Sequence, residues 1–530
     1  MRSRARAPVP LLTDLPSRAA YAEGAGMYRI VPQAVARIET VDEARRLVAW
    51  AADTGTPLVP RGAGSGMPGH NVGRGVVVDL SSCKSLEVNQ RDRLIRAGPG
   101  VTWAEVTDAA RPHGLRLPPD PSSGSFATSG AMVATNAAGP RSVKYGSVRR
   151  WVEAVEVVGV DGTVRVVKRG GGSGEWFALD EAGRRIAETS FPRTRKNSGG
   201  YALDPFARSG DELDLFVGSE GTLGIVTAVH WRLDPIPPDA AGLAVGLQDL
   251  ATLGDAVTYL VALNPSAVEL LDRTLLDMAG DVTAGLPTAL ACVLLVEFER
   301  DTAAAARGVV GDAVRGLHGL AAHIETAPDR TGLERLWTMR RAASPALARL
   351  PATRRSLQLI EDGCVPLERL GEYVAGLRAA AARHDVPVVV FGHAGDGHVH
   401  ANVLPDLTRP DWRDALAAVF DEVTELVGRL GGTPSGEHGI GRLRAGVLER
   451  FVGREAMDLM RAVKTAYDPA GILNPGVILP AADWAPLADL KVGPAAAPIP
   501  DDIAARLREV ERAAAWATPK ASLTTRAPNP

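Results

Sequence analysis

Apolar residues recur with two different spacings along the chain, which predicts a mixture of helices and strands. Residues 39–54 have the spacing of an amphipathic helix, and Thr40 is placed to cap its N-terminus, with Glu43 three positions later. Further segments with helical spacing are 101–113, 302–317, 411–430 and 501–515. Apolar and β-branched runs predict strands at 75–80, 93–97, 152–159, 163–168, 213–217, 224–233, 290–299, 386–391 and 399–404.

Stretches without a clear period divide these elements into regions. Residues 117–146 are rich in Gly, Ser, Pro and Ala, which is typical of a binding region or a linker, and residues 170–197 look like an inserted loop. The Pro-rich residues 234–238 cannot continue a sheet, so they are the best candidate for a domain boundary. We expect a loose arm over residues 1–20, and an Ala- and Pro-rich tail after residue 480 whose last dozen residues are disordered.

Composition and charge exclude several classes of protein. A chain of 530 residues has room for about two to four domains. The net charge of −3 argues against a nucleic-acid partner. The N-terminus is basic but lacks the apolar core of a signal peptide, and no apolar run is long enough to predict a transmembrane segment. The three cysteines, Cys83, Cys292 and Cys364, form no C-x-x-C pair, which excludes an iron–sulfur cluster within the chain and suits a reducing cytoplasm.

Residues 60–71 (PRGAGSGMPGHN) contain a literal match to the dinucleotide-binding pattern G-x-G-x-x-G, from Gly64 to Gly69. In that pattern the glycines open a helix whose N-terminal amide groups bind the pyrophosphate. Here a predicted strand follows instead, and no helix separates the glycines from Glu87, the acidic residue at the expected distance. The stretch is therefore not a Rossmann site. Two interpretations stay open: a loop between strands that binds a pyrophosphate through backbone amides, or a flexible surface turn.

Residues 391–402 (FGHAGDGHVHAN) concentrate three of the ten histidines of the chain. One predicted strand ends at His393, and His398, His400 and Asn402 alternate along the next, so these three share a face. Neutral imidazoles suit zinc or a similar divalent ion. The alternative is that the histidines only form hydrogen bonds within the loop and strand.

Glu437 and His438 stand side by side in a second glycine-rich turn, GTPSGEHGIGR, at residues 432–442. Glu437 could complete a set of two histidines and one carboxylate that leaves coordination positions open for a substrate. His438 could act as a general base near neutral pH. The alternative is a solvated loop, but the flanking glycines imply a close approach of the backbone to another group.

A series of short motifs together gives the chain a family resemblance. They are PRGAGSG, SGAMVATNAAG (129–139), KYGSVRRWV (144–152), VGSEGTLGIVT (217–227), GHAGDGHVHAN, PSGEHGIG and DPAGILNPG (468–476). In this order, over about residues 25–480, the chain resembles the FAD-linked 2-hydroxyacid dehydrogenases of the vanillyl-alcohol-oxidase (PCMH) type. These include D-lactate dehydrogenase, the glycolate oxidase large subunit and D-2-hydroxyglutarate dehydrogenase.

The resemblance implies an α+β fold and a set of FAD-binding residues. The implied parts are an N-terminal arm (1–24), a two-part PCMH-type FAD-binding domain (25–234), an α+β cap domain (235–480) and a partly disordered tail (481–530). The implied FAD contacts are Arg61, Gly62, Ala63, Gly64, Ser65 and Gly66 at the pyrophosphate, Gly130, Ala131, Thr135, Asn136 and Gly139 along the flavin and ribityl chain, Gly221, Ile225 and Val226 near the adenine, and Asn474 at the flavin ring. Relatives with covalent FAD carry a histidine where this chain has Ser65. Non-covalent FAD is therefore expected, with His70 as a remote alternative linkage point.

The resemblance also assigns the chemistry. His393, His400 and Glu437 match the family's metal ligands, with zinc the expected metal, and His438 matches its base. Arg340, in LWTMRR, matches the arginine that binds the substrate carboxylate, whereas the residues alone favour a solvated helix arginine. The implied reaction oxidises a 2-hydroxy acid, expected to be a D-2-hydroxy acid such as D-lactate, glycolate or D-2-hydroxyglutarate, to the 2-oxo acid. The metal lowers the pKa of the hydroxyl, a proton leaves to His438, and a hydride passes to flavin N5.

Because the chain lacks cluster cysteines, its electrons must leave to a separate acceptor: oxygen, a quinone, an electron-transfer flavoprotein or an iron–sulfur protein. We expect a cytoplasmic protein, and a peripheral association with a membrane stays open. The sequence does not decide the oligomeric state, for which a homodimer is one option.

Several positions depart from the family pattern and bear on substrate identity more than on reaction class. His398 replaces the usual asparagine of GDGNLH, and is either an extra metal ligand or a change in metal preference. Arg341 stands where relatives often have an acidic residue, which could favour a dicarboxylate or a bulkier acid. Ala138 replaces a glycine of NAGG, and Val477 replaces a common polar residue after ILNPG.

Two other functions remain to be weighed. A non-catalytic flavin subunit of an electron-transfer complex would lack the base, the carboxylate anchor or the metal set, and all three are present here. An alcohol oxidase or ether-lipid synthase of the same fold would need no His/His/Glu metal set, so metal analysis would separate it from the leading hypothesis.

Overall fold

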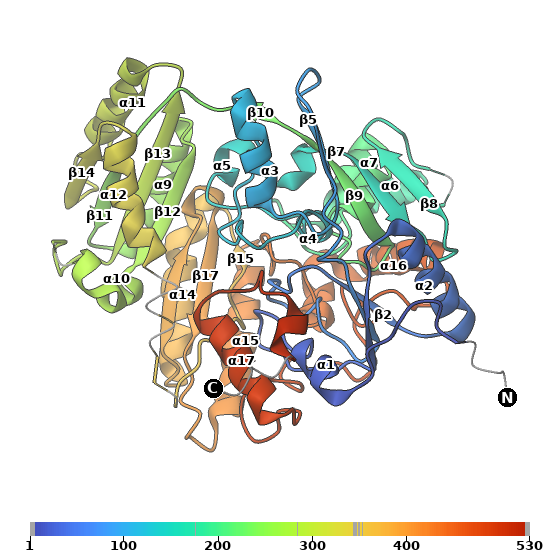
Figure 1. Ribbon diagram of the computed structural model, residues 1–530. Coiled ribbons are helices and arrows are strands. Elements are labelled where there is room, and N and C mark those ends of the chain that lie inside the picture. The colour runs from blue at the N-terminus through green and yellow to red at the C-terminus, as the bar shows by residue number, and fades with distance from the viewer. Residues whose placement is uncertain are drawn as a thin grey trace, which may run out of the picture.

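The computed structural model describes residues 6–174, 176–283, 285–342, 347, 350–351 and 353–524. Figure 1 shows two sheet-based regions side by side, one from the N-terminal half of the chain and one from the C-terminal half. The red C-terminal segment lies next to the blue N-terminal helix α1 (Leu15–Ala20). The chain therefore returns to its N-terminal region after building the second half.

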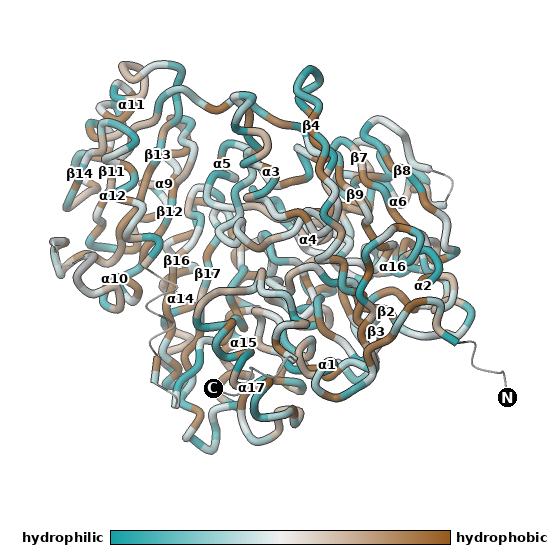
Figure 2. Tube along the Cα trace, in the orientation of Figure 1, coloured by the Kyte–Doolittle hydropathy of each residue, from teal (hydrophilic) through white to brown (hydrophobic). Residues whose placement is uncertain are grey.

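A parallel three-stranded sheet carries the glycine-rich loop. Its order is β1 (Ala34–Arg37), β3 (Val76–Asp79), β2 (Leu58–Arg61), and residues 62–75 connect β2 to β3. Successive strand residues point to opposite faces, so Leu58 and Val76 pack toward α2 (Val41–Thr54), whereas Val59 and Val77 pack toward α1 and α17 (Asp501–Arg512). Figure 2 shows the resulting hydrophobic colour along β2 and β3. The loop thus leaves a strand that is packed on both faces.

An antiparallel five-stranded sheet forms the second part of the N-terminal half. Its order is β4 (Leu86–Asn89), β5 (Leu94–Ala97), β9 (Ile225–Arg232), β7 (Val152–Val158), β8 (Val164–Lys168). The helices of this half are α3 (Trp103–Ala110), α4 (Ser129–Thr135), α5 (Ser142–Tyr145), α6 (Glu181–Ser190), α7 (Leu203–Ser209) and α8 (Leu213–Phe216). The two-residue strands β6 (Leu115–Arg116) and β10 (Asp234–Pro235) pair with each other before the chain enters the second half.

The C-terminal half is built on an antiparallel seven-stranded sheet. Its order is β14 (His323–Ala327), β11 (Asp239–Leu247), β13 (Cys292–Arg300), β12 (Ala267–Asp272), β16 (Val388–Gly392), β17 (His398–Val403), β15 (Gly363–Cys364). One face packs against α9 (Leu253–Ala262), α11 (Ala303–Gly316), α14 (Leu370–Arg383) and α15 (Trp412–Arg429). The other face packs against α10 (Arg273–Ala279) and α12 (Arg330–Arg341).

The chain then crosses back to the N-terminal half through α16 (Glu449–Tyr467). Met460 and Tyr467 of this helix are buried in the core of the five-stranded sheet. Leu473 pairs with Leu58 in a parallel bridge at the edge of β2. This return brings the ILNPG motif to the base of the glycine-rich loop.

The structure confirms most of the predicted elements and corrects two. The helix predicted at 39–54 is α2, and Thr40 and Glu43 form the reciprocal hydrogen bonds of a capping box. The strand predicted at 213–217 is wrong: this short apolar run is the fully buried helix α8, and periodicity cannot separate the two over four residues. The loop predicted at 170–197 is wrong in part, because it contains α6, which begins at Asp180 as its N-cap.

The two ends of the chain are more ordered than predicted. Residues 15–20 are not a loose arm but form α1, where Ala19 and Ala20 are buried against residues of α17. Residues 519–524, predicted to be disordered, contain the short helix η8 (Lys520–Leu523) with Leu523 buried. Residues 6–14 of the predicted arm are described too, with Val9 buried and Leu12 bridged to Val35. Residues 1–5 of the arm and residues 525–530 of the predicted disordered end lie outside the described residues.

Candidate active site

The predicted metal ligands converge at the hairpin of β16 and β17. His393 follows β16, His400 lies on β17 opposite Phe391, and Glu437 comes from the glycine-rich turn after α15. All three ligand side chains are buried. Their candidate ligand atoms, together with one from His398, all lie within 4.8 Å of one another. The structure thus brings together residues that sequence spacing alone could only suggest.

Hydrogen bonds on the outer side of each imidazole fix its tautomer. His393 Nδ1 donates to Glu269 Oε1 at 2.5 Å, and His400 Nδ1 donates to the Glu361 carbonyl at 3.0 Å. The lone pairs on both Nε2 atoms therefore face inward. There the Nε2 atoms lie 3.4 Å from each other and 3.3 and 3.4 Å from Glu437 Oε1. Two imidazole nitrogens and a carboxylate oxygen gathered at these distances form a donor set that fits a divalent metal.

His438, the predicted base, stacks on the ring of His400, one of the predicted metal ligands. Its ring lies 5.1 Å from the ring of His400 at an interplanar angle of 17°, and about a quarter of its side chain is exposed. Nδ1 donates to the Glu361 carboxylate, and Nε2 lies 3.7 Å from Glu437 Oε1. Nδ1 of His438 is therefore fixed by Glu361, and Nε2 lies on the side of the predicted metal ligands.

Carboxylates behind His438 favour its charged form. Burial acts to lower the pKa of His438, but the charges of Glu361 and Asp362 outweigh it and raise the pKa to about 10. A divalent cation at the ligand cluster would oppose the imidazolium, because both charges would be positive and close together. The neutral form of His438, which the predicted base requires, would therefore be favoured by a cation at the ligand cluster.

Sequence reasoning missed five charged residues that hold this site: Lys196, Glu269, Glu361, Asp362 and Arg444. Asp362 accepts hydrogen bonds from Ser435 Oγ and from the backbone amides of Glu437 and His438, and so fixes the turn. Arg444 Nη2 donates to Glu361 at 2.7 Å. The sequence did offer one indication of these residues, the adjacent Glu361 and Asp362 in the otherwise apolar run LIEDGC. Carboxylates are rarely buried in such a run unless they have a charged or hydrogen-bonding partner.

Lys196 reaches the site from the N-terminal half. Its Nζ lies 2.8 Å from Glu437 Oε2 and 3.5 Å from Asp396 Oδ2, and its side chain is only 4% exposed. Although burial acts to raise it, Lys196 and His393 hold the pKa of the Glu437 carboxyl well below its ordinary value. Glu437 is therefore an anion in the folded protein, as a metal ligand must be.

Arg340, predicted to bind the substrate carboxylate, lies beside the same cluster. Its Nε donates to Glu269 Oε2 at 2.7 Å, and its guanidinium lies over the Phe391 ring at 4.6 Å. The two Nη groups have no hydrogen-bond partner among the described residues, so the outer edge of the fork is free for a carboxylate. Glu269 binds both Arg340 and His393, which couples the position of the arginine to that of a metal ligand.

The glycine-rich loop leaves no room for side chains. A Cβ on Gly62 would lie 2.2 Å from Thr128 Oγ1, and one on Gly66 would lie 2.0 Å from His70 Nε2. Gly64 has φ +83°, which other residues rarely adopt. Ala63 is buried and Ser65 is half-buried in the same loop. The loop backbone therefore packs closely against Thr128, Arg61 and His70, and only glycine fits at positions 62, 64 and 66.

Arg61 holds the loop from inside. Its guanidinium donates to the carbonyls of Tyr21, Glu23 and Asn71, with distances of 2.7 to 3.3 Å, and the side chain is buried. Both Nη groups of Arg61 therefore bind backbone carbonyls. The direct contact of Arg61 with the cofactor stays a prediction.

The other predicted FAD residues lie on segments that meet at this loop. Asn136, in the left-handed conformation at the end of α4, packs near Gly218, and Asn474 Nδ2 donates to the carbonyls of His70 and Glu220 at 2.8 Å. Thr135 lies on α4 and bonds back to the carbonyl of Ala131. Gly130 packs against Pro99, Gly139 against Asp120 and Gly221 against Pro60, while Ile225 and Val226 are buried at the start of β9.

Several buried polar atoms beside the glycine-rich loop lack a hydrogen-bond partner within the described part of the chain. Thr128 Oγ1, Asn136 Oδ1 and Asn474 Oδ1 are buried with no hydrogen-bond partner among the described residues. Buried acceptors left unpaired are costly, so their gathering beside a glycine loop fits a ligand with several hydroxyl and N–H groups. The residues present therefore fit FAD.

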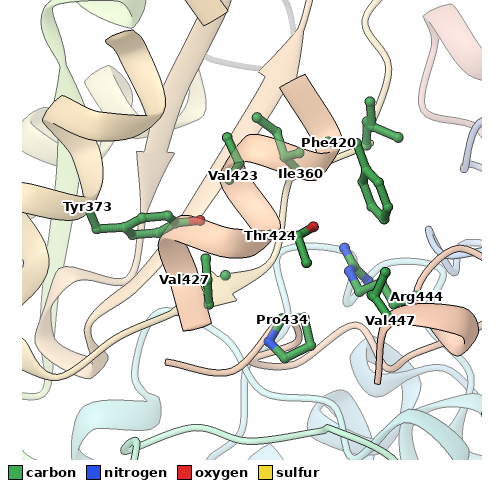
Figure 3. Close-up of a pocket in the computed structure, with 11 residues that line it drawn as sticks. Ile360, Tyr373, Phe420, Val423, Thr424, Val427, Pro434, Arg444 and Val447 are labelled. Carbon is green, nitrogen blue, oxygen red and sulfur yellow. The ribbon is translucent and has the colours of Figure 1, made fainter. Parts of the chain in front are cut away.

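A small cavity lies behind the site and is distinct from it. Figure 3 shows Tyr373, Thr424 and Arg444 around it, with apolar side chains of α15 on one side. Its volume of about 20 Å³ has room for one water molecule and not for a hydroxy acid. This cavity is therefore not the substrate site.

Comparison with known proteins decides the family. A model of the FAD binding domain matches residues 32–168, and a model of the C-terminal domain of FAD linked oxidases matches residues 236–478. A glycolate oxidase subunit GlcD of Bacillus subtilis is 32% identical over 455 residues, which cover 85% of this chain and 89% of that protein. The chain belongs to the FAD-linked oxidases. It is an FAD-linked oxidoreductase of the 2-hydroxyacid dehydrogenase and oxidase type.

Other relatives carry related names. A D-lactate dehydrogenase of Archaeoglobus fulgidus is 30% identical, over 83% of this chain and 89% of that protein. A D-2-hydroxyglutarate dehydrogenase of Stutzerimonas stutzeri is 28% identical, over 89% of this chain and 97% of that protein. These matches confirm the resemblance read from the motifs.

Solved structures confirm the predicted two-domain PCMH-type fold. p-Cresol methylhydroxylase with substrate bound has a TM-score of 0.63 at 16% identity, covering 89% of this chain and 94% of its own. An alkyldihydroxyacetonephosphate synthase has a TM-score of 0.61 at 17% identity, covering 88% of this chain and 82% of its own. At these identities the likeness concerns the fold alone. Within the described part of this FAD-linked oxidase, no helix is long and apolar enough to cross a membrane.

Ion pairs join the two halves of this FAD-linked oxidase. Arg116 Nη1 lies 2.8 Å from Glu299, and Arg141 Nη2 lies 2.8 Å from Glu297. Lys144 Nζ is 3.2 Å from Glu299. The two glutamates lie on β13 of the larger sheet, and their partners come from segments between β5 and β7. These pairs fix the surface along which the two halves meet.

Proposed function

We propose that the protein oxidises a D-2-hydroxy acid, such as D-lactate, glycolate or D-2-hydroxyglutarate, to the 2-oxo acid, using non-covalent FAD and a divalent metal, with zinc the expected ion. The observation that carries the proposal is the convergence of His393 Nε2, His400 Nε2 and Glu437 Oε1 beside His438. The relatives named as glycolate oxidase subunit, D-lactate dehydrogenase and D-2-hydroxyglutarate dehydrogenase support the substrate class.

Each residue has a role that follows from its contacts. When bound, the metal supplies Lewis-acid chemistry and FAD supplies a hydride acceptor. His393, His400 and Glu437 hold the cation, and Arg340 holds the substrate carboxylate through its free Nη groups. His438 accepts the hydroxyl proton at Nε2, while Glu361 keeps Nδ1 protonated and orients the ring.

Contacts of Arg341 give no support to a dicarboxylate substrate. Its side chain is 56% exposed and pairs with Glu334 of the same helix at 3.0 Å. Arg340 is only 11% exposed and faces the cluster. Of these two arginines only Arg340 faces the cluster, so within the proposed class the contacts favour a monocarboxylate such as lactate or glycolate over D-2-hydroxyglutarate.

Ser65 supports non-covalent attachment of FAD, because it has no nucleophilic ring nitrogen to offer. His70, the alternative linkage point, has its Nδ1 3.3 Å from Glu220 Oε2 but forms no hydrogen bond there among the described residues, so its contacts do not decide against it. The electron acceptor is proposed to be a separate molecule, and the relative named as a subunit of glycolate oxidase is consistent with a partner protein. Denaturing the protein and separating it from small molecules tests the attachment: non-covalent FAD would leave with the small molecules, whereas covalent FAD would stay with the protein.

The decisive experiment follows the flavin absorbance without oxygen. The purified protein is mixed with D- and L-lactate, glycolate and D-2-hydroxyglutarate, and bleaching near 450 nm is recorded together with the metal content. We expect bleaching by at least one D-2-hydroxy acid or glycolate, at a rate that falls when the metal is removed and recovers with Zn²⁺. Bleaching that ignores chelation would contradict the metal, and bleaching only by phenols or alcohols would contradict the substrate class.

A further inference from the structure

His398 is a buried histidine that has one nitrogen without a partner. Its side chain is fully buried, and Nε2 donates to Asp362 Oδ1 at 2.9 Å. Nδ1 is buried with no hydrogen-bond partner among the described residues. Among the four histidines of the site, the rings of His393, His400 and His438 have both a fixed nitrogen and an assigned task, whereas Nδ1 of His398 has none.

The partners of Asp362 decide which nitrogen of His398 carries the proton. Asp362 accepts from Ser435 Oγ at 2.6 Å and from the amides of Glu437 and His438 at 3.1 and 3.0 Å. It is therefore a carboxylate, and the Nε2 atom facing it must be the N–H donor. Nδ1 of the neutral ring is then left with a lone pair. A lone pair in a buried place calls for either a donor or a cation.

The position of the His398 ring points to a cation. One of its nitrogens belongs to the group in which the ligand atoms of His393, His400 and Glu437 lie within 4.8 Å of one another. The ring centroid lies 4.6 Å from that of His400 and 5.4 Å from that of His393. A Cβ on Gly436 would lie 2.6 Å from Cδ2 of His398, so the backbone packs against that edge of the ring and limits its rotation.

We infer that His398 Nδ1 is a fourth protein ligand, so that this chain holds its metal with three imidazoles and one carboxylate. The inference rests on the proposed metal centre and deepens it. Asp362 is then the outer partner of His398, as Glu269 is of His393, and the two carboxylate–histidine pairs repeat one arrangement.

A fourth ligand changes which metal the site prefers. Three imidazoles and one carboxylate favour zinc, cobalt or nickel over magnesium, calcium and manganese, which take oxygen ligands. A 2-hydroxy acid that binds through its hydroxyl and carboxylate oxygens would complete six positions. A protein with the usual family asparagine at position 398 would offer two imidazoles to the metal instead of three.

The first test compares cobalt binding by the FAD-loaded wild type with that of His398→Asn, which restores the family residue. Each protein is stripped of metal and titrated with Co²⁺ against a chelator, and the visible Co²⁺ spectrum is recorded. We expect His398→Asn to bind Co²⁺ at least about tenfold more weakly and to show a shifted spectrum. His384→Asn is the matched control, because His384 lies at the end of α14 and pairs with Glu422, outside the cluster. It should match the wild type.

The second test needs no variant. Pulsed electron paramagnetic resonance of the Cu²⁺-loaded wild type counts coordinated imidazoles: three support the inference and two overturn it, even if His398→Asn fails to fold. Equal Co²⁺ affinity and spectrum in wild type and His398→Asn would also overturn it, leaving His398 as a hydrogen-bond donor to Asp362. A wild type that binds no Co²⁺ would instead overturn the proposed metal centre itself, and with it this inference.

Discussion

Lys196 Nζ lies 2.8 Å from Glu437 Oε2, so a buried lysine of the N-terminal half neutralises the carboxylate of a proposed metal ligand in the C-terminal half. The same ammonium faces Asp396 at 3.5 Å. Both carboxylates are buried. The contact therefore joins the two halves at the candidate active site itself.

Replacing that lysine should destabilise the whole protein. Lys196→Met leaves Glu437 without its buried counter-charge, and breaking such a pair typically costs about 3–5 kcal/mol. Denaturant unfolding of the FAD-loaded protein should show a clearly lower midpoint. Lys84→Met is the control, because its pair with Glu105 is 2.7 Å long but both side chains are more than 40% exposed, for an expected loss under about 1 kcal/mol. Equal midpoints for the two variants would refute the structural role of Lys196.

Removing the proposed base should stop flavin reduction without releasing FAD. His438→Ala deletes the proton acceptor, and a positioned general base typically contributes about 10²–10⁴-fold to rate. The side-chain contacts of His438 are with His400, Glu361, Asp362 and Glu437, and among the described residues none of them is with the glycine-rich loop. Rapid mixing with substrate under anaerobic conditions measures the rate, and the visible absorbance gives the FAD content. Reduction at the wild-type rate would show that another group takes the proton.

A methyl group in the glycine-rich loop should cost FAD binding. In Gly62→Ala the new Cβ would meet the buried Thr128 Oγ1 at 2.2 Å, so the loop must shift where FAD approaches. We expect a lower ratio of flavin to protein after purification. Gly308→Ala is the matched control, because that glycine lies in α11 with nothing within 4 Å of an added Cβ. Full flavin content in Gly62→Ala would show that the loop tolerates the shift.

Acid should weaken the contact between the two halves. Burial acts to raise the pKa of Glu299, but Arg116, Tyr145 and Lys144 outweigh it and lower the pKa from 4.5 to about 2. Because the folded pKa is depressed, the stabilisation is complete above about pH 4.5 and is lost as the pH falls toward 2. The shift corresponds to roughly 3 kcal/mol.

A glutamine substitution isolates this effect. Glu299→Gln should lower stability at pH 7 and flatten its dependence on pH between 4.5 and 2, as followed by tryptophan fluorescence in denaturant at each pH. Glu334→Gln is the control, since Glu334 is 70% exposed in its pair with Arg341. An unchanged pH profile in Glu299→Gln would assign acid sensitivity to other carboxylates.

The parts of the site that the sequence predicted share one property: their residues are close together along the chain. His393, His398 and His400 fall on one short hairpin, where the two-residue repeat of a strand sets which side chains share a face. Glu437 was proposed from its residue type in a glycine-rich turn, and the family resemblance then added Arg340; no periodicity connects either residue to the hairpin. The same short range explains why helix α2 and its cap were predicted correctly.

The parts that were missed depend on contacts between distant segments. Glu269 is 124 residues from His393, and Lys196 is 241 residues from Glu437. Neither residue type nor local spacing distinguishes Lys196 from an ordinary surface lysine. The short helix α8 was missed for a different reason, because four residues, all buried and one of them Asp214, are too few to show a period.

The β16–β17 hairpin has a consequence for the order in which the protein folds. His393 and His400 are seven residues apart, so they meet as soon as this local turn forms, at little cost in loop entropy. Glu437 must arrive from beyond α15, and Lys196 only once the two halves have docked. If the proposed metal centre forms, a metal ion would meet the histidines of this hairpin first and the complete ligand set last, so tight metal binding would report the final step of assembly.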